Sequence, residues 1–398
     1  MFIGVNGAGK SNILEAIGVL SGALGKGVMP QELDYKGVRL SLPHLFKSTF
    51  KNRKIPKTFS ISAEFNDFSY GASVFAGESS ANLHFRTEHL DTDQGRILGR
   101  GPNGAKLHRA KDGLPSSAFY LDSSRSVYNA LGTFAELDES VIDQIDEIAS
   151  YVVYAPQTAV MRGIAPDVRA VEPLGIIGGR LAHAFEEVIR HIGDLREKKK
   201  HKLANDLDEI IKIIWSPGWA DSMEIGLHNS KIVPDHIGSA GEMIYISDRF
   251  MKSGRNQLSA YDASEGTLYL IFIATLLAHP RSPKILALDN VDGTLNPGLV
   301  RRLVEHIANV TCNKERDDIS SIKQIFMTSH NPTALDAIDI FNDDQRIFIV
   351  SRNSKDGGTE FLRLQPPKGM NKSDWQIRSG GKSLSRMWIE DQLTKALG

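Results

Sequence analysis

The first residues able to do chemistry lie at the start of the chain, where Gly4 to Ser11 has the sequence GVNGAGKS. This matches G-x-x-x-x-G-K-[ST], a loop whose glycines let backbone N–H groups surround a polyphosphate. The lysine of this loop reaches the β- and γ-phosphates, and its serine hydroxyl binds magnesium. The pattern predicts a site for ATP and Mg²⁺ whose nucleotide contacts come from Asn6, Gly7, Ala8, Gly9, Lys10, Ser11 and Asn12.

Two polar residues in the C-terminal third each follow an apolar run. Residues 284–288 lead to Asp289, and residues 325–329 lead to His330. An aspartate at the end of a strand in a nucleotide-binding sheet holds the magnesium shell. A histidine after a strand is more often structural, but its order after Asp289 favours a role in the same site.

A second phosphate-facing feature is predicted at the start of a long apolar helix. Residues 262–267 precede the apolar residues 268–278. Ser264 and Gly266 would lie at the helix N-terminus, where free N–H groups and the helix dipole favour an anion. The chain therefore offers two phosphate-facing sites, distinct in sequence from each other.

The elements that must position these residues alternate between strands and helices. A buried strand at residues 2–5 precedes the loop, and apolar residues recur at helical spacing over residues 13–20. Residues 124–149 are predicted to be helical. A strand at residues 150–154 then leads to Gln157.

Residues 58–111 predict a β-meander. Residues 59–65 alternate at period two, and further strands are expected near residues 81–87 and 95–110. Gly-rich turns separate these candidate strands.

Two amphipathic helices are predicted between Gln157 and Ser264, and they form a short antiparallel hairpin. A basic tip at residues 198–202 joins them. The two apolar stripes are Leu181, Phe185, Val188, Ile189, Ile192 and Leu195, and Leu203, Leu207, Ile210, Ile211 and Ile214.

The segment after His330 predicts a small β-hairpin, residues 346–350 with residues 359–364, and a terminal helix. Apolar residues on that helix either dock a partner or pack on the parent lobe. They are Leu384, Met387, Trp388 and Ile389.

Composition bounds the class of protein. The chain has 398 residues, which suggests two or three domains or one large domain with insertions. Its 47 basic and 48 acidic residues give a net charge of -1, which excludes a globally basic nucleic-acid binder. The single cysteine excludes a disulfide framework. The longest apolar run is too short for a membrane span, and no signal peptide precedes the first motif, so we expect a cytoplasmic protein.

The order of these motifs resembles the ABC-type ATPase heads of the SMC, RecF and OLD group among the AAA family ATPases. More narrowly, the chain resembles ATPase subunits of bacterial anti-phage systems of the OLD-like, Septu-like and retron-associated kinds. The resemblance implies an α/β P-loop NTPase head with an antiparallel β subdomain and a short helical hairpin insertion. It divides the chain into a first ATPase lobe (1–160), the hairpin with connecting strands (161–255) and a second lobe (256–398).

The resemblance also assigns roles to single residues. Gly4 to Ser11 matches the Walker A loop, and Ser264 to Gly266 resembles a shortened signature motif. Residues 295–297 match the D-loop, and His330 matches the switch histidine. The implied catalytic residues are Gln157, Asn290, Asp292 and His330, and the implied magnesium ligands are Ser11, Asp289 and Gln157.

The resemblance implies a nucleotide sandwich between two copies of the chain. The Walker A loop of one copy and Ser264 of the other would hold the same γ-phosphate, in a two-fold symmetric homodimer. ATP would join the two heads, and hydrolysis would release them.

Asn290 departs from the family pattern, since active relatives have a glutamate after the Walker B aspartate. An amide can orient the attacking water but cannot accept its proton. We therefore expect tight ATP binding with slow hydrolysis. The alternative is a tolerated substitution with turnover preserved through His330, and whether Asp292 reaches the water is open.

Two departures concern the ends of the chain. Only three residues precede Gly4, whereas relatives have one or two strands there. We expect that the natural chain begins upstream or that this lobe is incomplete. The stretch after His330 is too short for the TOPRIM nuclease domain of OLD-type relatives. This motivates the hypothesis of a separately encoded effector, a nuclease or toxin, gated by the ATPase.

Contact with DNA is a further possibility, although a run of charges is more often a solvated surface. The basic tip at residues 198–202 could neutralise phosphates. Two other functions compete with the effector-gating ATPase. One is a DNA-repair or chromosome-type clamp. The other is a non-hydrolysing scaffold stabilised by nucleotide, which Asn290 favours. The other candidate DNA contacts are Lys47, Lys51, Arg53, Lys54 and Lys57.

Overall fold

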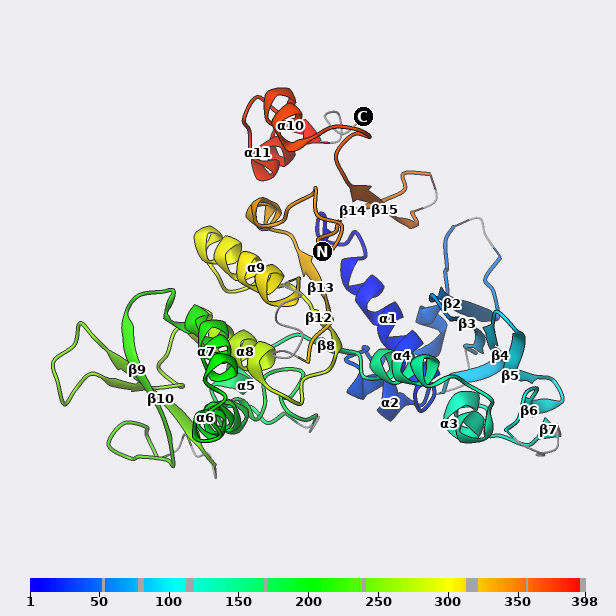
Figure 1. Cartoon of the computed structure of the whole chain (residues 1–398), viewed down its shortest axis with the longest axis horizontal. Helices are drawn as coiled ribbons and strands as arrows, with labels where there is room; N and C mark the ends of the chain where they lie inside the picture. The colour runs from blue at the N-terminus through cyan, green and yellow to red at the C-terminus, as the bar shows by residue number, and fades with distance from the viewer. Residues whose placement is uncertain are drawn as a thin grey trace.

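The computed structural model describes residues 1–51, 54–77, 82–111, 118–167, 171–235, 237, 241–312, 321–355 and 357–393. A central sheet lies between two flanking parts (Figure 1). The β-meander lies on one side, and the helical hairpin with a second antiparallel sheet lies on the other. Among the described residues, no helix is both long and apolar enough to cross a membrane.

The central sheet has the strand order β15-β14-β1-β13-β12-β8. All neighbours pair in parallel except β14 and β15, which form an antiparallel hairpin. Parallel strands place their carboxyl ends at one edge, which is where ligands bind in such sheets. The strands are β1 (Phe2–Ile3), β8 (Val152–Tyr154), β12 (Ile285–Leu288), β13 (Gln324–Ser329), β14 (Ile347–Arg352) and β15 (Thr359–Leu364).

Helices cover both faces of this sheet, which explains its continuous apolar strands. Helix α1 (Lys10–Leu24) packs through Leu14 on the face that carries Phe2 and Ala287. Helices α8 (Glu265–Ala278) and α9 (Pro297–Thr311) pack on the face that carries Ile3 and Leu288. The predicted strands and helices around the phosphate-binding loop are therefore confirmed.

The predicted β-meander is confirmed as a six-stranded antiparallel sheet with consecutive strands as neighbours. Its third strand begins later than expected, at His84 rather than near residue 81. The sheet packs on α1 and α4 around a separate apolar core. The strands are β2 (Thr58–Glu64), β3 (Phe68–Phe75), β4 (His84–Thr92), β5 (Gly95–Gly101), β6 (Gly104–Leu107) and β7 (Ala118–Phe119).

The predicted helix at residues 124–149 is interrupted. Helix α3 ends after five residues and passes into a 3₁₀ turn, and α4 begins only at Glu139. The backbone leaves the helical region at Ala135, which follows the 3₁₀ turn and has an extended ψ of 145°. The segments in this region are α3 (Val127–Leu131), η2 (Gly132–Phe134) and α4 (Glu139–Ala149). Two short segments follow α1 earlier in the chain, α2 (Pro30–Tyr35) and η1 (Pro43–Phe46).

The helical hairpin is confirmed as α6 (Leu181–Glu197) and α7 (His201–Ile211), followed by η3 (Lys212–Trp215). The hairpin packs against α8, and its apolar residues join the core that contains that helix. One residue of the first predicted stripe is wrong, because Ile189 is 43% exposed while Val188 is buried. The hairpin and the central sheet both pack on α8, which explains why α8 is apolar on all sides.

A three-stranded antiparallel sheet follows the hairpin, with the order β11-β10-β9. Only connecting strands were predicted in this part of the chain. The strands are β9 (Ala220–Gly226), β10 (Met243–Asp248) and β11 (Gln257–Ser259).

The C-terminal segment forms two short helices, α10 (Lys372–Arg378) and α11 (Leu384–Ile389), instead of one. Leu384 and Met387 are buried in the main core, and α11 packs on η5 (Pro332–Ala337). The backbone N–H of Ser385 donates to Asp336 Oδ1 at 2.8 Å. Of the two alternatives, packing on the parent lobe is confirmed for these residues, whereas Ile389 is 73% exposed.

Candidate functional site

The phosphate-binding loop connects β1 to α1 at the carboxyl edge of the sheet. Gly7 and Gly9 have φ values of 79° and 104°, in the left-handed region that favours glycine. A Cβ added to Gly9 would lie 2.4 Å from the Oγ1 atom of Thr359. This position therefore accepts only glycine, both for its backbone conformation and for its close contact with β15.

Lys10 is the first residue of α1, and its side chain folds back over the loop. The ammonium donates to the carbonyl oxygens of Gly4 at 2.8 Å and Val5 at 3.1 Å. Partial burial lowers the pKa of Lys10, while the negative charges of Asp292 and Asp289 raise it. The charge of Lys10 is thus held at the mouth of the loop, next to two carboxylates.

Ser11, Asp289 and Thr328 are brought together from three elements. The hydroxyl groups of Ser11 and Thr328 both donate to Asp289 Oδ1, at 3.0 and 2.5 Å. The Thr328 oxygen in turn accepts the backbone N–H of Asn290 at 2.7 Å. This network fixes the aspartate at the end of β12, beside the start of α1.

The donor set fits a magnesium ion. Carboxylate and hydroxyl oxygens are the hard ligands that Mg²⁺ prefers, and Ser11 and Asp289 already lie within hydrogen-bond distance. Asp292 Oδ1 and the Tyr269 hydroxyl are enclosed and have no hydrogen-bond partner in the described part of the chain. Burial, and after it the charges of Asp292 and Asp289, raise the pKa of Tyr269. The site thus keeps polar atoms free for a hydrated ion.

Asn290 has a left-handed backbone with a φ of 60°. Its backbone oxygen accepts the N–H of Gly293 at 3.0 Å, which closes a turn. Its side-chain amide covers that turn, because a Cβ added to Gly293 would lie 2.7 Å from Asn290 Nδ2. Asn290 is exposed at the position where a glutamate would present its carboxylate.

The Asp292 side chain is 1% exposed and faces the segment that carries His330. Its Oδ2 atom accepts the backbone N–H groups of His330 at 3.3 Å and Asn331 at 2.8 Å. The same oxygen lies 3.4 Å from the His330 Nδ1 atom, while the His330 side chain is 48% exposed. Asp292 therefore holds the histidine segment in place and leaves the imidazole open to the site.

Residues 1–336 match the family described as "AAA domain, putative AbiEii toxin, Type IV TA system". The chain belongs to this family. Its predicted membership of the AAA family ATPases is thereby confirmed. No curated protein matches the chain.

Solved structures of Smc head domains also match this AAA domain. One is an Smc head bound to the C-winged helix domain of ScpA, with 19% identity and a TM-score of 0.43. Another is the head from Thermotoga maritima, with 15% identity and a TM-score of 0.36. A third, bound to the C-terminal domain of ScpA derived from Pyrococcus furiosus, has 15% identity and a TM-score of 0.37. Each match covers 92% of this chain and 89% of the other.

Gln157 of the AAA domain immediately precedes α5 (Thr158–Met161), shortly after β8, and its side chain is exposed. Its backbone N–H donates to the Ile177 oxygen at 2.8 Å. In the described residues, no hydrogen bond joins its side chain to Ser11 or Asp289. The strand before it pairs with β12, so Gln157 and Asp289 follow neighbouring strands at the same edge of the sheet.

Ser264 caps the N-terminus of α8 and is exposed. Its hydroxyl accepts the Thr267 N–H at 3.3 Å and lies 2.7 Å from Thr267 Oγ1. Gly266 faces the D-loop, since an added Cβ would lie 3.1 Å from Leu295 Cδ2. Asn296 directly follows Leu295 and caps α9, because its side-chain oxygen accepts the backbone N–H of Leu299 at 3.0 Å. The predicted signature and D-loop segments are therefore neighbours on the surface of the AAA domain.

Two residues that contact the phosphate-binding loop were not predicted from the sequence. Arg352 Nε donates to the Gly7 oxygen at 2.8 Å, and the Thr359 hydroxyl donates to the Ala8 oxygen at 3.1 Å. Both belong to the β14–β15 hairpin, which reaches the loop because β14 pairs with β1. No local motif marks them, and only a prediction of that strand pairing could have found them.

The candidate DNA contacts differ in their exposure to solvent. Lys47 is 7% exposed, so its prediction as a DNA contact is wrong, because its side chain packs inside the AAA domain. Lys51, Lys54 and Lys57 are exposed, as is the basic tip at residues 198–202. Arg53 lies outside the described residues.

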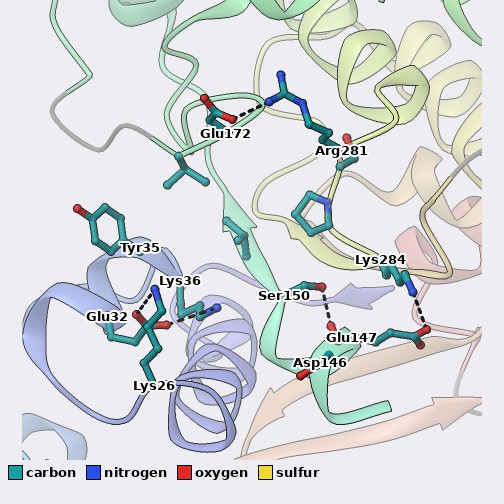
Figure 2. A pocket seen from close by; sticks show the side chains of 14 residues that line it. Lys26, Glu32, Tyr35, Lys36, Asp146, Glu147, Ser150, Glu172, Arg281 and Lys284 are labelled. Atoms are coloured by element: carbon teal, nitrogen blue, oxygen red, sulfur yellow. Dashed lines mark hydrogen bonds and ion pairs between the residues drawn. The ribbon is translucent and has the colours of Figure 1, made fainter. Parts of the chain in front are cut away.

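A cavity of about 550 Å³ lies at the opposite edge of the sheet, near the amino ends of β8 and β12 (Figure 2). Its cations are paired with acids: Lys36 with Glu32 at 3.7 Å, and Lys284 with Glu147 at 3.1 Å. These charges already neutralise each other. The loop that carries Lys10 and Ser11, at the other edge of the sheet, is therefore the better candidate for a nucleotide site than this cavity.

Proposed function

We propose that this AAA domain binds ATP with Mg²⁺, hydrolyses it slowly, and uses the nucleotide to pair two copies of the chain. The observation that carries the proposal is the meeting of Lys10, Ser11 and Asp289 at the carboxyl edge of one parallel sheet. A cation, a hydroxyl and a carboxylate are the groups that phosphoryl transfer requires beside a phosphate-binding loop.

The loop would bind the phosphates through its backbone N–H groups and through Lys10, which exchanges its two carbonyl partners for phosphate oxygens. A magnesium ion held by Ser11 and Asp289 would neutralise charge on the phosphate oxygens. Thr328 keeps Asp289 in position, because its hydroxyl donates to the same oxygen as Ser11.

Slow hydrolysis follows from the groups near the attacking water. Asn290 cannot accept a proton, and the loss of a general base costs about 10²–10⁴-fold in rate. Asp292 is enclosed and directed at the histidine segment, so it acts as a positioning residue. His330, held by Asp292 and open on its other side, is the group we assign to contact the γ-phosphate or the water.

The pairing of two copies is supported by the exposed surface at Ser264. The start of α8 and the D-loop at Leu295 are in contact there, so a helix N-terminus and a loop form one face. We propose that this face covers the nucleotide of a second copy in a two-fold symmetric homodimer. The free N–H groups at the N-terminus of α8 would then donate hydrogen bonds to the γ-phosphate.

We further propose that the nucleotide state of this dimer gates a separately encoded effector, a nuclease or toxin, in anti-phage defence. The family description supports this direction, since it names a putative AbiEii toxin and a toxin–antitoxin system. Co-purification of such a protein from the native operon, dependent on ATP, tests it.

DNA binding is the second candidate, and the exposed basic tip at residues 198–202 favours it. Binding to duplex DNA should then weaken steeply as salt rises, because released counterions drive phosphate contacts. The packing of the hairpin along α8 speaks against the projecting arm of a chromosome-type clamp.

Calorimetry and steady-state phosphate release test the proposed function. Wild type should bind ATP with Mg²⁺ and turn over well below about 1 s⁻¹. Lys10→Ala should weaken ATP binding at least about 10-fold, since a charged hydrogen bond contributes about 1.5–3 kcal/mol. Lys26→Ala, at the opposite edge of the sheet, is the control and should bind as wild type does. Equal binding by Lys10→Ala and wild type would refute the proposal.

A further inference from the structure

A histidine and two glutamates lie together far from the nucleotide site in sequence. His183 and Glu186 are three residues apart on α6, so both lie on one face of the helix. Glu242 immediately precedes β10 and reaches the same place. One ligand atom from each of the three side chains lies within 4.8 Å of the others.

The two nitrogens of His183 face different carboxylates. Nδ1 lies 3.2 Å from Glu242 Oε2, and Nε2 lies 3.7 Å from Glu187 Oε1. A metal-bound histidine usually gives its second ring nitrogen to a carboxylate, which fixes the tautomer and the ring orientation. With Nδ1 as the ligand atom, Glu187 is the carboxylate on the side of Nε2, at a distance longer than a hydrogen bond.

Glu187 is itself held in place. It lies 3.1 Å from His279 Nε2, and the guanidinium of Arg281 donates to it at 2.7 Å. The contacts with His279 and Arg281 therefore orient the carboxylate that faces Nε2.

The remaining surroundings leave room for an ion. Glu186 Oε2 lies 3.1 Å from the guanidinium of Arg190. Among the described residues near this carboxylate, Arg190 is the one arginine that a bound cation would have to displace. His183 and Glu242 also line a cavity of about 240 Å³, together with Met161 and Met243. Water in that cavity could supply a further ligand.

We propose that His183, Glu186 and Glu242 bind one divalent transition-metal ion of the Zn²⁺ class. One imidazole and two carboxylates suit zinc or manganese, whereas Mg²⁺ prefers oxygen ligands alone. The ion would join α6 to β10, and so the helical hairpin to the second antiparallel sheet. This proposal does not depend on ATP binding.

Calorimetry with zinc chloride and the chelator-treated full chain tests this site. Wild type should bind one ion, and His183→Ala and Glu242→Gln should each lose at least about 10-fold in affinity. His201→Ala removes an exposed histidine from the start of α7 and is the matched control, with binding unchanged. Magnesium chloride should give no comparable binding.

Two further readouts separate the site from its alternatives. Zinc should raise the melting temperature of wild type but not of Glu242→Gln, and cobalt bound to wild type should show the visible absorption of a nitrogen- and oxygen-ligated ion. Lys10→Ala should keep its zinc affinity, so failure of the proposed function would leave this result intact. Equal zinc affinity in wild type and Glu242→Gln, with both folded, would overturn the proposal.

Discussion

Asn290 combines two properties that bear on catalysis. Its φ of 60° lies in a region that asparagine tolerates better than most residues, and its amide lies over the turn to Gly293. The side chain type therefore suits the backbone at this position, while it removes the carboxylate that a general base requires. The structural fit of Asn290 and the slow hydrolysis that we propose would then have the same cause.

Asn290→Glu should raise the steady-state rate of phosphate release about 10-fold or more, because it restores a general base. Asn290→Gln is the matched control, since it has the same length and the same backbone strain of roughly 1–2 kcal/mol but no carboxylate. The comparison between these two variants measures the carboxylate alone. Equal rates would show that the slow step lies elsewhere.

Asp292→Asn should lower the maximal rate of hydrolysis by roughly 10-fold or more, because the charge that holds His330 is lost. The affinity for ATP should change less than about 2-fold, because Asp292 acts through His330 and not on the phosphates. Phosphate release and calorimetry on the same variant separate the two effects. A parallel loss of ATP affinity would assign Asp292 to the nucleotide itself.

At the scale of elements, the apolar strands and their order were predictable because burial on both faces leaves a continuous apolar run. Only connecting strands were predicted for the second antiparallel sheet, because β9 has few apolar residues and a long connection separates it from its partner β10. The contact of the β14–β15 hairpin with the phosphate-binding loop was missed, since it depends on a pairing between β1 and β14, at opposite ends of the chain.

A buried acid in the β-meander makes the stability of this element depend on pH. Glu88 on β4 accepts the Tyr70 hydroxyl at 3.0 Å and the Val127 N–H at 3.1 Å, and lies 3.5 Å from Arg100. Burial raises the pKa of Glu88 from 4.5 to about 7, although Arg100 and these hydrogen bonds lower it. The folded chain therefore keeps this proton at pH values where the unfolded chain has lost it.

Stability from Glu88 is fully present below pH 4.5 and is lost as pH rises through about 7. This contribution of Glu88 to the free energy of unfolding is about 3 kcal/mol. Glu88→Gln cannot ionise, so its stability relative to wild type should increase across this window. Urea unfolding at several pH values measures the difference, with the exposed Glu64→Gln as a control that follows wild type. Parallel curves for wild type and Glu88→Gln would contradict this expectation.

At the scale of the whole molecule, most of the candidate site could be predicted from the sequence because parallel strands bring their carboxyl ends to one edge. The loop, Gln157, Asp289 and His330 all follow strands of the central sheet. The loop was predicted from its glycine-rich motif, and the other three as polar residues after an apolar run. Ser264 begins a helix instead, on a surface shared with the D-loop. Which surface it meets in a second copy is a property of the pair and not of one chain.

A mixture of two inactive variants tests the shared nucleotide site most directly. Lys10→Ala lacks the phosphate-binding lysine, and Ser264→Arg blocks the helix start that would cover the partner's nucleotide. Each alone should release little phosphate, while Ser264→Arg should still bind ATP. A mixed dimer pairs the intact loop of one variant with the intact Ser264 of the other, so we expect the mixture to regain phosphate release. No gain on mixing, with both variants folded, would contradict the account.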